Sequence, residues 1–226
     1  MAQNLSTISK QPASITISRR LYNLFTFSMV TISFIITWLE YQFVSNGGLT
    51  TVFEHMNPLL YFVIFFGGTI GGLIVMSNGK SKQSVSMSLI GYALFTLTFG
   101  GSLALLLTHY KVGTISYAFG ITACISGIFL VAGVVFPEFF ARLGRVLGLS
   151  LIALIVVELV SVVFLHANQT IFDYITILLF CGFLGYDSYR MSADDPTVPN
   201  AVFYATNIYI DVVNILIRVL NIIDNR

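Results

Sequence analysis

Charged residues are scarce in this chain. Only 9% of its 226 residues are Asp, Glu, Lys or Arg, whereas about a quarter are charged in a typical soluble domain. The net charge of +1 gives no support to nucleic acid as a partner. Because 56% of the residues are hydrophobic, disorder is excluded as well. The composition is typical of an integral membrane protein.

Other features are also missing. The two cysteines, Cys124 and Cys181, lie inside apolar runs, which is typical of small core residues rather than of a disulfide or metal cluster. No long hydrophilic insertion suggests a second, soluble domain. No G-x-S-x-G motif supports a rhomboid-like serine protease, and no Gly-x-Gly-Asp element surrounds Asp211 as in presenilin-type proteases. We therefore expect no enzymatic activity and no bound cofactor.

Seven apolar runs are long enough to cross a bilayer, for which about 20 apolar residues are needed. The spans cover residues 21–44, 58–76, 86–108, 115–136, 144–165, 170–190 and 200–223. The expected fold is therefore an all-α polytopic membrane protein. We divide it into a polar tail at residues 1–20 and a single transmembrane domain at residues 21–226. Pro137 is expected to end the fourth span.

The basic residues predict the orientation of the chain. With the N-terminus in the cytoplasm, eight of the eleven Lys and Arg residues fall on the inner side. They are Lys10, Arg19, Arg20, Lys80, Lys82, Arg142, Arg145 and Arg190; the other three are Lys111, Arg218 and Arg226. We therefore expect the N-terminus inside.

We single out four carboxylates within the spans, because ionisable residues there are costly and suggest function. Glu40 follows Trp38-Leu39 near the outer end of its span, which is typical of an interfacial aromatic belt. Glu158 lies deeper and is expected to face the bundle or a water-filled cavity. A structural hydrogen bond and a place on an ion path are both open for it.

The other two carboxylates, Asp187 and Asp211, lie in the last two spans, which form an antiparallel pair. Counting residues at about 1.5 Å each leaves a mismatch in depth of a turn or two. The sixth span would have to continue past Arg190, or the linker dip inward, for the two side chains to meet. If they meet, two carboxylates in a low-dielectric site cannot both ionise cheaply, so they would share a proton. Otherwise, each hydrogen-bonds or caps a helix separately.

Glycines in the second span indicate close helix packing. Gly67-Gly68 and Gly71-Gly72 form two overlapping GxxxG patterns, and Gly144 with Gly148 forms another. Small residues at this spacing let helices approach each other closely. We expect Gly68 and Gly72 to face a neighbouring helix of the same chain.

The C-terminal motifs resemble those of the Bax inhibitor-1 family. Tyr186-Asp187 ends the sixth span, and Ile208-Tyr209-Ile210-Asp211-Val212-Val213-Asn214 follows, as a "YD" and a "LYLDxxNLF" stretch do in that family. The resemblance implies a seventh helix surrounded by the other six. It also implies a pH-sensitive calcium leak gated by Asp187 and Asp211, which would bind calcium transiently. The compact chain resembles bacterial members, which implies the bacterial plasma membrane.

One position departs from the family pattern. Bacterial members place an arginine at the cytoplasmic end of helix two, where it pairs with the aspartates. This chain has Met76-Ser77-Asn78-Gly79-Lys80 there. Lys80 or Lys82 is the expected substitute, although lysine lacks the bidentate fork of arginine. A weaker latch predicts a higher basal leak than in arginine-bearing relatives.

Two functions therefore remain open. The first is a proton-regulated cation leak, with calcium or protons as ligands and Glu158 as a further group on the path. The second is a non-conducting interaction or quality-control protein that binds other membrane proteins. Ion flux into liposomes containing the pure protein distinguishes the two.

Overall fold

The fold was analysed in a computed structural model that describes residues 16–48, 57–161 and 169–224. Those residues contain seven helices, each long and apolar enough to cross a membrane. They are α1 (Arg19–Ser45), α3 (Pro58–Ser81), α4 (Val85–Leu107), α5 (Val112–Val135), α6 (Pro137–Val160), α7 (Gln169–Ala193) and α8 (Val198–Asp224). The all-α fold is confirmed. Residues 1–15 of the expected tail lie outside the described residues.

The start of α6 corrects the sequence prediction. The fifth span was expected from Gly144, yet the helix begins at Pro137, with the proline in its first turn. Proline suits this position because its missing N–H would have no partner within the helix, and its fixed φ is already helical. The charged residues Glu138, Arg142 and Arg145 make the first turns of α6 too polar to be recognised as part of an apolar run. The expected end at Leu165 lies outside the described residues.

The linker between α7 and α8 is short, and α7 is longer than expected. The helix continues past Arg190 to Ala193, and α8 begins at Val198. The longer α7 meets one of the two conditions set for contact between Asp187 and Asp211. Because α8 also begins earlier than expected, Asp187 still lies six residues before the end of α7 and Asp211 thirteen after the start of α8.

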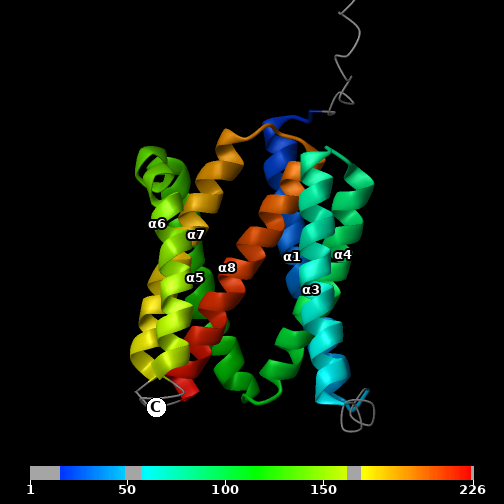
Figure 1. Cartoon of the computed structure of the whole chain (residues 1–226), viewed down its shortest axis with the longest axis vertical. Coiled ribbons are helices and arrows are strands. Elements are labelled where there is room, and N and C mark those ends of the chain that lie inside the picture. The colour runs from blue at the N-terminus through cyan, green and yellow to red at the C-terminus, as the bar shows by residue number, and fades with distance from the viewer. Residues whose placement is uncertain (1–15, 49–56, 162–168, 225–226) are drawn as a thin grey trace, which may run out of the picture.

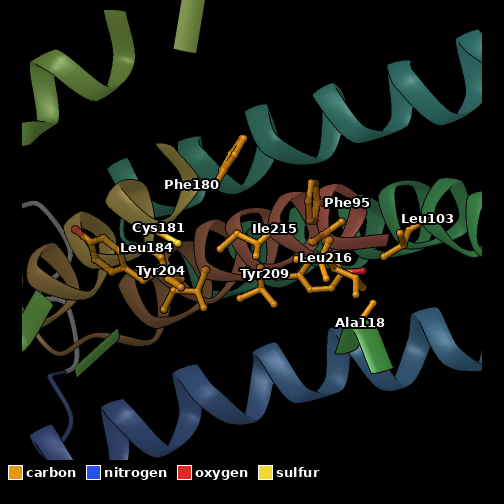
Figure 2. Close-up of a cluster of buried hydrophobic side chains, with 14 of the residues drawn as sticks. Phe95, Leu103, Ala118, Phe180, Cys181, Leu184, Tyr204, Tyr209, Ile215 and Leu216 are labelled. Carbon is orange, nitrogen blue, oxygen red and sulfur yellow. The ribbon is translucent and has the colours of Figure 1, made fainter. Parts of the chain in front are cut away.

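The central element of the bundle is α8. It runs obliquely through the middle of the molecule in Figure 1 and contacts α1, α3, α4, α5 and α7. Consecutive residues such as those at 211–213 are all buried, so every face of the helix is covered. The central seventh helix implied by the family resemblance is therefore present. Figure 2 shows Tyr204, Tyr209, Ile215 and Leu216 of α8 within the buried apolar cluster.

The outer surface of the bundle is apolar. In α6, only Phe140 and Leu147 are buried, whereas Leu149 and Ile152 are largely exposed. Leu59 and Leu178 are exposed on α3 and α7 in the same way. Such side chains would be costly in water, and they suit the hydrocarbon interior of a bilayer.

Glycines bring α3 and α4 into close contact. A Cβ atom added at Gly72 would lie 2.6 Å from the backbone nitrogen of Phe95, and one at Gly68 would collide with Thr98. The expected packing role of Gly68 and Gly72 is therefore confirmed. At Gly67, by contrast, an added Cβ meets nothing within 4 Å.

This asymmetry within one glycine cluster gives a matched test of packing. We expect Gly72→Leu to destabilise the fold by about 3 kcal/mol or more, because backbone atoms of α4 cannot move aside as a side chain can. Gly67→Leu adds the same side chain to the same helix and should be nearly neutral. Folded yield and melting temperature in detergent measure the difference. Equal losses for the two variants would contradict the assigned packing.

Candidate functional site

Asp187 and Asp211 line the same pocket, between α7 and the central helix. The pocket has a volume of about 270 Å³. Its other lining residues are Leu151, Phe180, Phe183, Tyr186, Arg190, Asn207 and Ile210. Only 7% of Asp187 and 5% of Asp211 are exposed. Two nearly buried carboxyl groups from adjacent helices thus face one small, mostly apolar space.

The two carboxyl groups have few polar partners. The nearest cation to Asp187 is Arg190, whose Nη1 lies 3.9 Å from Oδ1, at the outer limit of an ion pair. Asn207 adds one polar side chain to the lining of the pocket. Among the described residues, Oδ2 of Asp211 is buried without a partner. The pocket therefore contains two acidic groups and one weakly placed guanidinium.

Lys80 does not pair with this carboxyl pair. Its ammonium donates to Oδ2 of Asp194 at 2.9 Å and to the hydroxyl of Tyr204 at 3.1 Å. Tyr204 also donates to Asp194 at 2.6 Å. Lys82 is exposed at the end of α3. The structure thus places Lys80 against the α7–α8 linker, and among the described residues neither lysine forms an ion pair with Asp187 or Asp211.

The N-terminal end of α1 holds the same linker. Arg19 Nη1 donates to the backbone oxygen of Asp194 at 2.8 Å, and the Ile17 N–H donates to the Pro196 oxygen at 2.8 Å. Thr16 and Thr197 form an isolated β-bridge. We call the set Arg19, Lys80, Asp194 and Tyr204 the linker clasp. It ties α1, α3 and α8 to the segment between the two aspartate-bearing helices.

Asp194 differs from the buried pair because it is partly exposed and strongly partnered. Its partial burial raises the pKa, but the hydrogen bonds from Tyr204 and Lys80 outweigh burial and lower the pKa below its usual value. A carboxyl group with a lowered pKa stabilises the fold above its unfolded-state pKa, and this stabilisation is lost as the pH falls through the folded-state pKa. The clasp should therefore remain ionised at neutral pH.

We expect Asp194→Asn to lower stability at pH 7 by about 1 kcal/mol or less, since the pair is only partly buried. The difference from wild type should disappear in acid, below about pH 3, where Asp194 itself is protonated. Melting curves over this pH range measure it, with Asp195→Asn, in the exposed neighbour, as the control. A difference that grows in acid would contradict the assigned ion pair.

Glu158 lies in a second ionic cluster. Arg218 donates to its two carboxylate oxygens at 2.7 and 3.1 Å and to Oδ1 of Asp173 at 3.2 Å. The expected polar partner of Glu158 is thus Arg218. The sequence prediction missed Asp173. Asp173, Phe180 and Asp187 follow one another at intervals of seven residues, which places all three on one face of α7.

Glu40 has a more buried position than an interfacial belt requires. Its Oε2 is buried and has no hydrogen-bond partner among the described residues. A Cβ atom at Gly100 would lie 2.7 Å from this oxygen and 2.7 Å from Oγ1 of Thr37. Thr37 in turn hydrogen-bonds the hydroxyl of Tyr209 at 2.5 Å. Glu40 therefore faces the α1–α4–α8 interface with at least one oxygen.

These features define a class of protein: a seven-helix integral membrane protein whose central helix carries one member of a buried carboxyl pair. A family model described as "Inhibitor of apoptosis-promoting Bax1" matches residues 15–226. The chain therefore belongs to the Bax inhibitor-1 family, as its C-terminal motifs indicated. No curated protein and no solved structure matches the chain.

Proposed function

We propose that the protein is a proton-regulated cation leak, with calcium as the cation that the available oxygen ligands suit best. One observation carries the proposal: Asp187 and Asp211, from neighbouring helices, line one pocket, and both side chains are nearly buried. If both ionise, the single guanidinium of Arg190 leaves the pocket with an excess negative charge. A proton shared by the pair, or a bound cation, removes that excess.

Protons and cations then compete for the same oxygens, and this competition makes the flux depend on pH. The shared proton holds α7 against α8 and leaves no charged site for calcium. Loss of the proton leaves two carboxylates that can bind a divalent cation. Without a cation, the two negative charges repel each other. The pair acts as both sensor and transient ligand, and the chain needs no catalytic group or cofactor.

The linker clasp sets how readily the pocket opens. It joins α3 through Lys80 to Asp194, which lies just beyond the end of α7, the helix that carries Asp187. The acidic member of the clasp has a lowered pKa. A clasp that stays ionised near neutral pH does not sense protons there. We assign the pH response to the carboxyl pair and the basal closure to the clasp.

The proposal includes an orientation. We place the clasp, the α7–α8 linker and residues 1–20 in the cytoplasm, on the basis of the eight-to-three distribution of basic residues. The membrane is the plasma membrane of a bacterial-type cell, on the basis of the compact chain. The pocket then opens near the inner surface of the membrane.

The test is calcium uptake by liposomes that contain the purified protein, measured with a trapped calcium-sensitive dye. We expect uptake above that of protein-free liposomes and a several-fold change between about pH 6 and pH 8. Uptake equal to the protein-free control at every pH would refute the leak.

A second candidate is a non-conducting protein that binds other membrane proteins. One observation favours it: Gly67 and Gly71 lie on the open side of α3, where an added Cβ meets nothing nearer than 3.9 Å. Small residues at this spacing can receive a helix of another protein. Absence of flux in liposomes, together with Gly67-dependent association, would support this candidate.

A further inference from the structure

The central helix carries a polar stripe along its whole length. Seven polar residues recur at alternating intervals of four and three, which places them on one face of α8. They are Asn200, Tyr204, Asn207, Asp211, Asn214, Arg218 and Asn221. The stripe begins at the linker clasp, passes the carboxyl pair and ends at the ionic cluster around Arg218. The two acidic sites are thus connected by one face of one helix.

The ionic cluster joins three helices at the end of the bundle opposite the α7–α8 linker. Arg218 of α8 holds Glu158 of α6 through two parallel hydrogen bonds of 2.7 and 3.1 Å and also holds Asp173 of α7 at 3.2 Å. Asn221 donates to the same Asp173 oxygen at 3.4 Å. The guanidinium therefore bridges two carboxylates that would otherwise repel each other.

The charge of this cluster is not balanced. Two carboxylates share one guanidinium, and the side chain of Asp173 is only 1% exposed. Within the described part of the chain, Oδ2 of Asp173 is buried without a hydrogen-bond partner. The hydroxyl of Thr176, one turn further along α7, is buried without a partner as well. An unpaired carboxylate oxygen in such a place is costly, so the cluster favours additional positive charge.

We propose that Asp173 and Glu158 form a divalent-cation site in which Arg218 is the resident, displaceable counter-ion. A divalent cation balances two carboxylates completely, whereas Arg218 balances only one. Calcium accepts carboxylate, amide and hydroxyl oxygens in flexible arrangements, and the unpaired oxygens of Asp173 and Thr176 are of this kind. Arg218 is partly exposed, which gives it room to move aside.

The site is weak by construction, as a site on a permeation path must be. Within the described residues, no group of three or more His, Cys, Asp or Glu side chains is placed to hold a metal. Arg218 also competes with any cation that arrives. It lies seven residues beyond Asp211, about 10 Å along the helix axis. The inference rests on the proposed function in one respect: it makes this cluster the outer mouth of the leak.

Calcium binding to the full-length protein in detergent tests the site without reference to flux. The melting temperature is measured at increasing calcium chloride concentrations, with potassium chloride of equal ionic strength as the reference. The protein carries Asp187→Asn and Asp211→Asn as a background, because these substitutions remove the other carboxyl pair. We expect Arg218→Gln to lower the half-saturating calcium concentration roughly tenfold, because the resident cation is gone. Adding Asp173→Asn should abolish the response. Arg145→Gln, in an exposed residue of α6, is the matched control for charge.

Arg218→Lys keeps the experiment informative if Arg218→Gln does not fold. Lysine retains the charge but cannot hold both oxygens of Glu158, so we expect a smaller gain in calcium affinity of the same sign. An identical calcium dependence in the background protein and the Arg218 variants would overturn the site. A stabilisation that depends on pH and not on calcium would also overturn the site, since a proton would then neutralise the second carboxylate. A protein that binds calcium here but conducts none would refute the leak and leave the binding site intact.

Discussion

Replacing Asp211 with Asn should flatten the pH dependence of calcium uptake between about pH 6 and pH 8. The asparagine amide can donate a hydrogen bond to ionised Asp187, so the remaining carboxylate no longer requires a shared proton. The several-fold change in uptake expected of the wild type should then become a nearly constant rate. Uptake into liposomes with a trapped dye measures both profiles.

Asp187→Asn should flatten the profile in the same way, because either replacement leaves a single carboxyl group in the pocket. Glu138→Gln, in the first turn of α6, is a control that removes a carboxyl group elsewhere. If both aspartate variants fold normally and keep the wild-type pH profile, the pair has only a structural role.

Replacing Lys80 with Met should raise calcium uptake about fivefold at every pH, without changing the shape of the pH profile. Methionine keeps most of the side-chain length but cannot bond Asp194 or Tyr204, so α3 loses its ionic contact with the linker. The loss of about 1 kcal/mol from the closed state shifts the balance between closed and open by roughly fivefold. Dye-monitored uptake at several pH values separates this change in amplitude from a change in pH response.

The matched control is Lys82→Met, which removes the same charge from an exposed residue two positions away. It should leave uptake unchanged. Equal increases for the two variants would show that loss of charge near the surface, and not the clasp, causes the leak.

Much of the fold follows from the sequence because a bilayer restricts what can cross it. Continuous apolar runs predict helices, and six of the seven starts lie within three residues of the prediction. The exception, α6, begins with Pro137 and several charged residues, so its first turns do not register as apolar. Hydropathy alone does not show which helix is central.

The site was predicted only in part, because the decisive contacts join distant segments. The family motifs identified Asp187 and Asp211, whereas counting residues from the linker did not show that the two side chains line one pocket. The sequence did not single out Asp194, yet it holds Lys80. Asp173 was overlooked because it is a single charge near the beginning of a span. The alternating four-and-three spacing in α8 was a readable signal for the Arg218 cluster.

The central claim is that Asp187 and Asp211 share a proton that is lost as the pH rises. Infrared spectroscopy of the protein in lipid tests it directly, because a protonated carboxyl group has a carbonyl band separate from those of carboxylates and amides. All spectra are recorded in a Glu40→Gln background, because Glu40 also has a buried carboxylate oxygen without a partner among the described residues. We predict such a band at about pH 6 that decreases by about pH 8, and that is absent when Asp187→Asn or Asp211→Asn is added. A background spectrum without the band at about pH 6, or a band that both added variants retain, would contradict the account.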